Sequence, residues 1–247
     1  MAPTRIDLDI ADGAAWIRLD GPETRNALDL DAVGALVAAC DRIDADRSIG
    51  VAIVTGVGPA FCAGADRAIL EELPTLSMAS QHERLDGLYA GFRRFGMLAV
   101  PTVAAVNGAA VGAGVNLALA ADLRVLTNDA VLTSGFARLG IHPGGGHLHL
   151  LDRASDASVA AAMGVFARPV DGPRAVQLGL AWAAVPPGEL RATVDDLVVH
   201  LANDPELARA LAASFRTTIK PVESWDRAIG IERERQAWSL ARPRKAT

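Results

Sequence analysis

Residues 51–66 read VAIVTGVGPAFCAGAD, and this stretch decides how the rest of the chain is interpreted. Residues 51–55 form a continuous apolar run that ends at Gly56, as expected of a buried parallel strand. A turn follows at 56–59, and the small residues 63–65 then lead into Asp66. The stretch therefore predicts a buried strand, a Gly-rich turn and the start of a helix.

The same design recurs about fifty residues later. Residues 101–106 (PTVAAV) predict a second buried strand, which ends at Asn107 and Gly108. Gly112 and Gly114 lie in the turn that follows, and residues 115–120 continue as a helix.

Working outward, strands alternate with helices first and a helical tail comes last. Further strands are expected at 16–19 and 123–126, with helices at 26–43 and 77–95. Beyond the turn at 143–146 the chain is mostly helical, and the expected helices are 158–164, 172–178, 189–201, 205–215 and 221–240. This order predicts an α/β fold with right-handed crossovers.

Composition excludes several classes of function. The chain has 247 residues, 51% of them hydrophobic and 21% charged, which suits one globular unit with a sizeable core. A net charge of −5 and an aromatic content of 4% argue against nucleic-acid binding, which needs a basic surface or stacking platforms.

The cellular setting is expected to be the cytoplasm. Cys40 and Cys62 do not make a disulfide framework, so a reducing compartment is the simpler interpretation. The N-terminus lacks an apolar signal-peptide core, and no apolar run approaches the ~20 residues of a membrane span.

The two Gly-rich turns are the places where chemistry is expected. Backbone N–H groups at a helix start have no intrahelical partner, and small residues let a ligand oxygen approach them. Two such groups aimed at one carbonyl would form an oxyanion hole. The alternative is that these glycines only shape tight turns. No dinucleotide fingerprint or phosphate loop is present, so spacing alone supports carbonyl or anion binding weakly.

Several motifs in order resemble the crotonase (enoyl-CoA hydratase/isomerase) superfamily over roughly residues 5 to 240. They are 25–28 (RNAL), 60–66 (AFCAGAD), 101–108 (PTVAAVNG), 112–114 (GAG), 117–118 (LA), 121–124 (ADLR), 139–146 (LGIHPGGG) and 175–180. The resemblance implies a ββα spiral core at 1–190 and a C-terminal helical oligomerisation region at 191–247. It also implies an acyl-CoA thioester as ligand and assembly as a homotrimer or a dimer of trimers.

The resemblance also implies site residues. The oxyanion hole would come from the N–H groups of Ala65 and Ala113. Segments that line the CoA moiety match here at Arg25, Ala27, Leu28, Ala63 and Asp66. Arg25 could equally be a solvated residue at a helix start, and Asp66 could be a helix cap. No metal is expected, and no cofactor beyond the coenzyme A of the substrate.

Two positions depart from the family pattern. Hydratases of this family move protons with two glutamates, and the matching positions here are Asn116 and Phe136. Neither side chain can take or give a proton at neutral pH. Because each general acid or base typically supplies 10²–10⁴-fold, little of the usual hydratase activity is expected.

Candidate substitutes for these glutamates have ordinary structural explanations as well. His142, His147 and His149 have a suitable unperturbed pKa, although loop histidines are more often surface or packing residues. Glu71 and Glu72 could reach the pocket or lie on a solvated helix face. Cys62 has apolar neighbours, which suggest an inert buried thiol.

Three hypotheses remain open at this point. The chain could be an enoyl-CoA hydratase/isomerase-like enzyme with a different base, an inactive acyl-CoA-binding or carrier protein, or a catalyst of another crotonase-type reaction such as thioester hydrolysis. Family members usually continue into a further lid helix, whereas here the sequence ends at residues 243–247 (PRKAT). That lid helix is therefore expected to be absent.

Overall fold

The computed structural model describes residues 3–219 and 222–242 and contains two sheets. The larger sheet has the strand order β1-β2-β3-β5-β7-β10. Its first two strands pair antiparallel, and every later neighbour joins in parallel. The strands are β1 (Arg5–Ala11), β2 (Ala14–Asp20), β3 (Val51–Gly56), β5 (Thr102–Val106), β7 (Leu123–Thr127) and β10 (Ala183–Val185).

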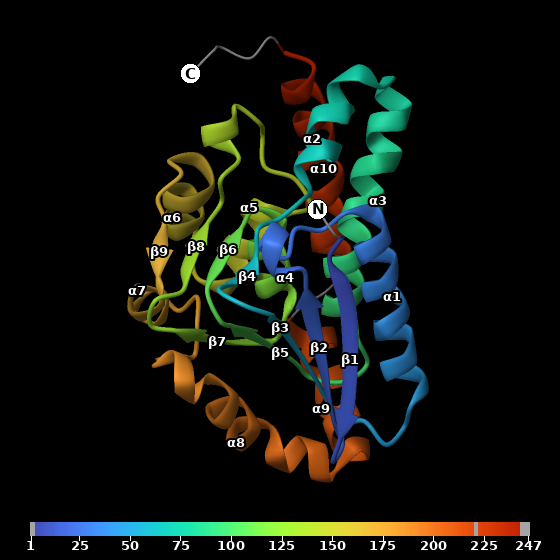
Figure 1. The fold of residues 1–247 in the computed structure, drawn as a ribbon, viewed down its shortest axis with the longest axis vertical. Coiled ribbons are helices and arrows are strands. Elements are labelled where there is room, and N and C mark those ends of the chain that lie inside the picture. The colour runs from blue at the N-terminus through green and yellow to red at the C-terminus, as the bar shows by residue number, and fades with distance from the viewer. Residues whose placement is uncertain (1–2, 220–221, 243–247) are drawn as a thin grey trace.

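The smaller sheet is built from the turns that follow the larger one. Its order is β4-β6-β8-β9, with strands β4 (Ala60–Cys62), β6 (Ala109–Val111), β8 (Val131–Thr133) and β9 (Val170–Asp171). Strands β3, β5 and β7 each lead into one of its short strands and then toward a helix. Three successive ββα units thus form the spiral, with β4, β6 and β8 side by side (Figure 1).

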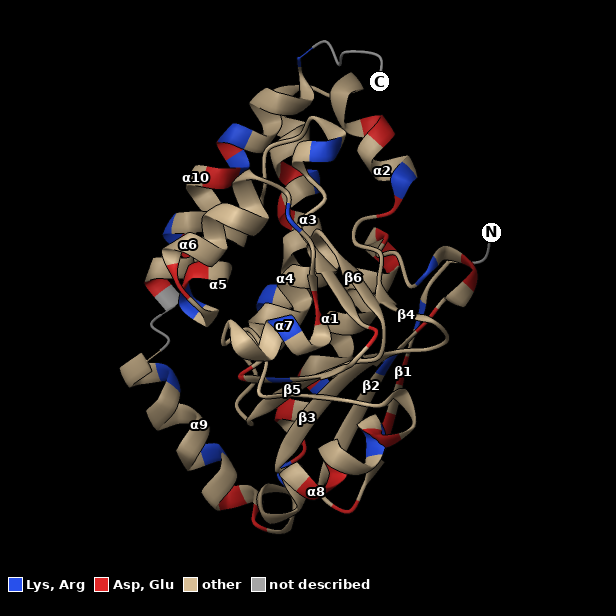
Figure 2. Ribbon diagram, turned by 90° about the vertical axis from the view of Figure 1, so that its left-hand side faces the viewer, with Lys and Arg blue, Asp and Glu red and all other residues tan. Residues whose placement is uncertain are grey.

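Helices enclose both sheets. They are α1 (Leu30–Ala45), α2 (Arg67–Glu72), α3 (Met78–Gly96), α4 (Ala113–Ala120), α5 (His147–Ala154), α6 (Ala157–Ala160), α7 (Gly172–Gln177), α8 (Leu190–Asn203), α9 (Pro205–Ile219) and α10 (Val222–Leu240). In the described ranges, no helix has the length and apolar character needed to cross a membrane. Basic and acidic residues are interspersed along the ribbon (Figure 2).

The inner strands of the larger sheet are buried on both faces, as the alternation of side chains along β3 shows. Val51 and Ile53 face α8, where they pack with Val194 and Val198. Ala52 and Val54 point the other way, into the main core beneath α1, α3 and α4. Because side chains alternate along a strand, a continuous apolar run is what such a two-sided strand requires.

The predicted α/β class and the long elements are confirmed, while the short strands were missed. Strands β4, β6 and β8 have three residues each, too few for a periodic pattern to be recognised. The antiparallel strand β1 was not predicted either. Residue 221, where the last helix was expected to begin, lies outside the described residues.

The expected start of the first long helix was wrong. Helix α1 begins at Leu30, and the Asp29 side chain caps it by accepting from the Ala32 N–H at 2.7 Å. Arg25 and Asn26 have positive φ angles of 55° and 59°, so they belong to a turn. This turn positions Leu28 beside Ala65.

Asn26 holds that turn to the neighbouring ββ connection. Its side chain is fully buried and accepts from the Gly21 N–H at 2.9 Å. Its amide nitrogen donates to the carbonyls of Val57, Ala60 and Phe61 at 2.8–3.2 Å. One side chain therefore satisfies backbone groups from two segments more than thirty residues apart.

We expect Asn26→Ala to lower the free energy of unfolding by about 3–5 kcal/mol, because it strands several buried polar groups and puts alanine in the left-handed region. Urea unfolding at fixed protein concentration measures this change. Asn128→Ala is the matched control, since the Asn128 side chain is exposed in a turn and its backbone φ is not positive. Equal stability of the two variants would show that Asn26 does not organise the turn.

Candidate functional site

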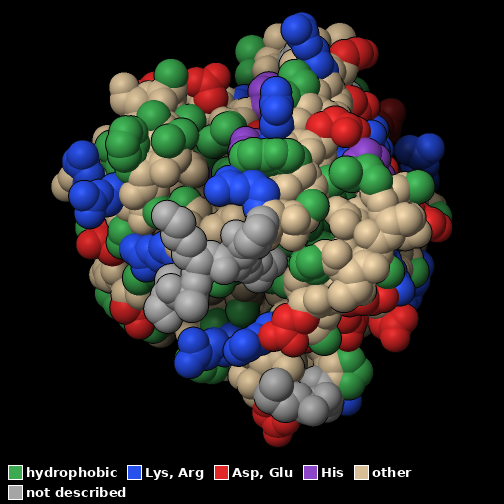
Figure 3. Space-filling model, turned by 90° about the horizontal axis from the view of Figure 1, so that it is seen from above, with side chains coloured by type: hydrophobic (Ala, Val, Ile, Leu, Met, Phe, Trp, Pro, Cys, Tyr) green, Lys and Arg blue, Asp and Glu red, His purple; other side chains and the backbone are tan. Residues whose placement is uncertain are grey.

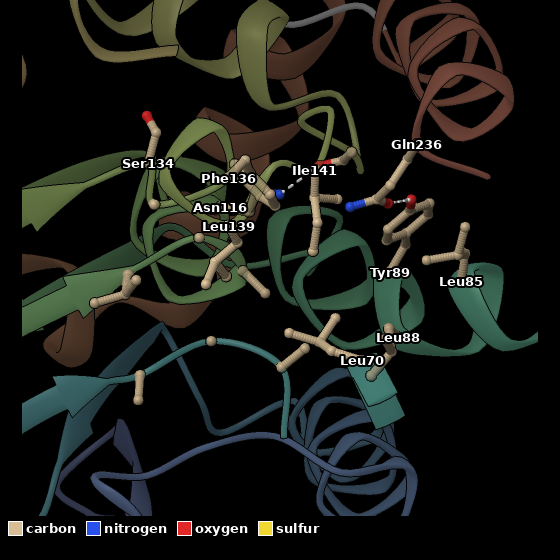
Figure 4. Close-up of a pocket in the computed structure, with 18 of the residues that line it drawn as sticks. Leu70, Leu85, Leu88, Tyr89, Asn116, Ser134, Phe136, Leu139, Ile141 and Gln236 are labelled. Carbon is tan, nitrogen blue, oxygen red and sulfur yellow. Dashed lines mark hydrogen bonds between the residues drawn. The ribbon is translucent and has the colours of Figure 1, made fainter. Parts of the chain in front are cut away.

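A pocket with about 620 Å³ of empty space, open to solvent at one end, lies where the two Gly-rich turns meet. Helices α3, α4 and α10 and the segment 134–144 complete its wall (Figure 4). Most of the side chains that line it are apolar, among them Leu70, Leu85, Leu88, Phe92, Val111, Phe136, Leu139 and Ile141.

Ala65 and Ala113 both line this pocket. Ala113 is the first residue of α4, so its N–H has no helical acceptor. Ala65 forms a parallel bridge with Leu28, in which the Leu28 N–H bonds to the Gly64 carbonyl and the Leu28 carbonyl accepts from Asp66 N–H. The Ala65 N–H therefore points away from Leu28, and neither N–H has a backbone acceptor in the described part of the chain.

Gly64 lets the two turns approach each other. Its φ is 93°, and a Cβ there would lie 2.6 Å from the Val111 carbonyl oxygen and 3.4 Å from the Ala113 nitrogen. A side chain at this position would push the two turns apart and block the space between the two N–H groups. The sequence-based expectation that glycine permits a close backbone approach applies here.

Asn116 lies on α4 in the pocket wall and is 1% exposed. Its amide nitrogen donates to the Gly144 carbonyl at 2.9 Å, which fixes the orientation of the amide, because a carbonyl can only accept. The amide oxygen then faces Nδ1 of His147 at 2.6 Å, so Nδ1 carries the proton. The other ring nitrogen, Nε2, accepts from the Ser134 hydroxyl at 2.7 Å.

His147 is held neutral behind the pocket wall. It is fully buried, and this burial lowers its pKa to about 3. The Phe136 ring stands edge-on against the imidazole, with 5.0 Å between ring centroids. Figure 4 shows the Ser134 side chain directed away from the pocket. The hydrogen bonds from Ser134 to His147 and from His147 to Asn116 orient the Asn116 amide.

Groups that titrate near neutral pH do not reach the pocket surface. Among the described residues that line it, none is Asp, Glu, His, Lys, Arg or Cys. Burial raises the pKa of the Tyr89 hydroxyl far above its usual range, so it stays protonated. Asn116 and Phe136 both lie in the pocket wall.

Helix α10 closes one side of the pocket. Its Gln236 side chain accepts a hydrogen bond from Tyr89 of α3, and both residues line the cavity. Trp225 donates to the Gly145 carbonyl at 3.1 Å, and the Ser239 hydroxyl accepts from the His142 N–H at 2.8 Å. A covering segment was expected only in a further helix, whereas α10 already supplies one wall.

Glu232 fastens α10 to the start of α5. Its carboxyl oxygens accept from the N–H groups of His147 and Leu148 at 2.7 and 2.9 Å. Burial raises the pKa of Glu232 to about 7, although these backbone donors lower it. The carboxyl group does not line the pocket, so its role is to connect the two helices.

The residues expected to contact CoA lie in two places. Ala63 lines the pocket, while Ala27 and Asp66 line a separate hollow outside it. Asp66 caps α2 by accepting from the Ala68 N–H at 2.8 Å, so the helix-cap alternative holds in this structure. Arg25 is exposed in its turn and is not part of α1.

The candidate proton-transfer substitutes lie outside the pocket lining. His142 is half-buried in a different hollow beside Trp238 and Arg242, and its Nδ1 lies 2.7 Å from the Pro143 carbonyl oxygen. Seen from above, hydrophobic side chains are exposed among scattered charged ones (Figure 3). His149 is half-buried on α5, where burial lowers its pKa.

Glu71 and Cys62 are structural residues. Glu71 forms an exposed ion pair with Arg67 one helical turn before it, and Glu72 pairs with Arg84, so both lie on a solvated face. Burial raises the pKa of the Cys62 thiol to about 12, which makes it inert as expected.

Sequence reasoning missed four residues of this site: Tyr89, Ser134, Glu232 and Gln236. One signal was present for the last two, since 225, 232, 236 and 239 repeat at spacings of seven, four and three, on one face of a helix. Nothing local distinguished Tyr89 or Ser134, because their partners lie far away in the chain.

Comparisons with known proteins agree with this geometry. The profile of the enoyl-CoA hydratase/isomerase family matches residues 9–238. A probable enoyl-CoA hydratase from Mycobacterium tuberculosis is 38% identical over 240 residues, covering 96% of this chain and 92% of the relative. A 1,2-epoxyphenylacetyl-CoA isomerase from Escherichia coli is 29% identical, covering 91% of this chain and 86% of the isomerase.

Solved structures share the fold over nearly the whole chain. An enoyl-CoA hydratase from Mycobacterium avium subsp. paratuberculosis superposes with a TM-score of 0.83 at 25% identity, covering 98% of this chain and 97% of that one. One from Mycobacterium smegmatis gives a TM-score of 0.86 at 22% identity, covering 97% and 85%. The ββα spiral, the motif order and the family profile together establish that this chain belongs to the enoyl-CoA hydratase/isomerase (crotonase) family.

Proposed function

We propose that this protein binds an acyl-CoA thioester in the pocket, with the thioester oxygen between the N–H groups of Ala65 and Ala113. The observation that carries the proposal is that these two N–H groups lack backbone acceptors and line one largely apolar pocket. Donors fixed in a water-poor site stabilise developing negative charge on an oxygen, by about 2.7–4 kcal/mol per donor in measured cases.

In this proposal, the protein polarises the thioester without supplying a general acid or base of its own. Hydration of an enoyl thioester requires a base for the water and an acid for the α-carbon. Asn116 and Phe136 occupy the matching wall positions, and the neutral His147 lies behind them. Chemistry at this site is therefore limited to reactions whose proton transfers use water or the substrate itself.

We expect hydration of crotonyl-CoA to be slower by about 10⁴-fold or more than in a family hydratase that keeps both glutamates, because two proton-transfer groups are missing. Loss of the enoyl absorbance, followed side by side for the two proteins, measures this difference. Turnover within tenfold of the reference hydratase would refute the proposed absence of acid and base.

Thioester hydrolysis is a second candidate, favoured by one observation. The hydrogen bonds from Ser134 to His147 and from His147 to Asn116 contain the elements of a nucleophile, a base and an orienting group. The Ser134 side chain, however, is directed away from the pocket (Figure 4), so it would have to rotate to attack a thioester. Release of free CoA that disappears in Ser134→Ala would favour this candidate over binding with polarisation.

Ala113→Pro tests the hole directly. Proline is tolerated at the first position of a helix, but it removes the N–H and puts a ring carbon in its place. We expect the variant to lose most of the downward shift of the thioester carbonyl stretch that infrared difference spectra show on binding. Affinity for a saturated acyl-CoA should fall by about tenfold or more.

Ala157→Pro is the matched control for this experiment. Residue 157 is exposed and is the first residue of α6, outside the pocket. The Ala157→Pro variant should bind the acyl-CoA with the same shift of the thioester carbonyl stretch as the unaltered protein. An unchanged shift in Ala113→Pro as well would rule out Ala113 as a donor to the thioester.

We further propose that the protein forms a homotrimer through α9. Leu207, Leu211 and Ile219 lie at multiples of four residues and are 50–61% exposed, whereas the other face of the helix buries Ala208 and Ala212. A stripe of exposed large apolar residues marks an interaction surface. Figure 2 shows α9 at the edge of the molecule, extending from the body.

Sedimentation should give about three times the chain mass of 25.7 kDa for the unaltered protein. Leu211→Glu is expected to dissociate it, because a charge would be buried in the contact. Thr217→Glu, on an exposed position away from the stripe, is the control and should leave the mass unchanged. A monomeric unaltered protein, or a trimeric Leu211→Glu, would contradict the proposal.

A further inference from the structure

Four side chains with polar atoms line the otherwise apolar pocket: Tyr89, Asn116, Ser134 and Gln236. What each of them presents to a ligand follows from the hydrogen bonds that it makes elsewhere. Ser134 presents nothing to the cavity, because its hydroxyl donates to His147 and is directed away (Figure 4).

The amide oxygen of Asn116 already accepts a hydrogen bond. The amide oxygen receives the Nδ1 proton of His147, and one amide hydrogen goes to the Gly144 carbonyl. An amide nitrogen carries two hydrogens, so a second one remains for a ligand. Asn116 can therefore offer the pocket a donor but not its acceptor.

Gln236 is oriented in the same way by Tyr89. The Tyr89 hydroxyl donates its hydrogen to the Gln236 amide oxygen. The opposite orientation of the amide would leave this buried hydroxyl hydrogen without an acceptor. Gln236 thus presents its amide nitrogen to the cavity.

The Gln236 amide nitrogen is a donor that faces the pocket. Gln236 is 4% exposed. Figure 4 shows the nitrogen directed away from Tyr89 and toward Ile141, inside the pocket. A donor placed in an apolar cavity costs free energy unless a ligand or water accepts from it.

We propose that the pocket selects acyl thioesters whose acyl chain carries a second acceptor oxygen, such as a keto group, over unsubstituted chains. This inference rests on the proposed acyl-CoA function. The thioester oxygen would take the two backbone donors, and the second oxygen would take the Gln236 amide, assisted by Asn116. A plain hydrocarbon chain leaves these donors unpaired and displaces the water that could serve them.

The test compares three ligands of equal length by calorimetry: hexanoyl-CoA, 3-oxohexanoyl-CoA and 5-oxohexanoyl-CoA. We expect at least one oxo ligand to bind about fivefold or more tightly than hexanoyl-CoA, which corresponds to about 1 kcal/mol for one net hydrogen bond. Dissociation constants that agree within twofold for all three ligands would overturn the selection and leave acyl-CoA binding intact. Absence of binding by all three would overturn both proposals.

Gln236→Met tests whether the Gln236 amide nitrogen causes the preference for oxo ligands. Methionine keeps the length of the side chain and removes the amide, so the oxo preference should vanish while the affinity for hexanoyl-CoA stays the same or rises. Gln177→Met makes the same change at an exposed site on α7 and should keep the preference. A preference that survives in Gln236→Met would overturn the assignment.

Tyr89→Phe is a second variant, in which the Gln236 amide itself is kept. Without the hydroxyl, the Gln236 amide loses the hydrogen bond that orients it, so the oxo preference should shrink while hexanoyl-CoA still binds. Thermal unfolding of each variant shows whether it is folded at the temperature of the titration. An undiminished preference in folded Tyr89→Phe would refute the orienting role.

Discussion

The close approach of two backbone turns at Gly64 is the contact on which this site depends. Any Cβ there would come within 2.6 Å of the Val111 carbonyl oxygen, so only glycine allows β4 and β6 to continue into turns that face each other. The parallel pairing of β4 with β6 sets this distance, and the bridge from Leu28 to Ala65 sets the direction of one N–H group. The proposed oxyanion hole is thus a product of sheet register, with no side chain involved.

The opposite wall is organised by polar groups that do not line the pocket. His147 and Glu232 are buried where α4, α5 and α10 meet; His147 is bonded to Asn116 in the pocket wall, and Glu232 accepts from the N–H groups of His147 and Leu148. Their environments shift the pKa of His147 to about 3 and of Glu232 to about 7, in both cases mainly through burial. The histidine therefore acts as a fixed neutral donor and acceptor, not as a proton carrier.

The pocket lining provides hydrogen-bond donors but no side chain that titrates near neutral pH. Its polar groups include backbone N–H groups and the amides of Asn116 and Gln236, which can donate to oxygen atoms, and none of its polar side chains titrates near neutral pH. Family membership identifies the kind of ligand, but the wall decides the chemistry, because the same fold supports any reaction that its side chains allow.

The sequence by itself determined the family, the buried strands β3, β5 and β7 and the long helices α8, α9 and α10, because long apolar runs, helical periodicity and Gly-rich motifs are local signals. It also identified Asn116 and Phe136 as departures from the pattern. Only the tertiary structure connected Ser134, His147 and Asn116 by hydrogen bonds. It also brought Tyr89 into contact with Gln236, 147 positions away in the sequence. Three-residue strands and contacts between distant segments leave no periodic trace, since their stability comes from packing that exists only in the folded chain.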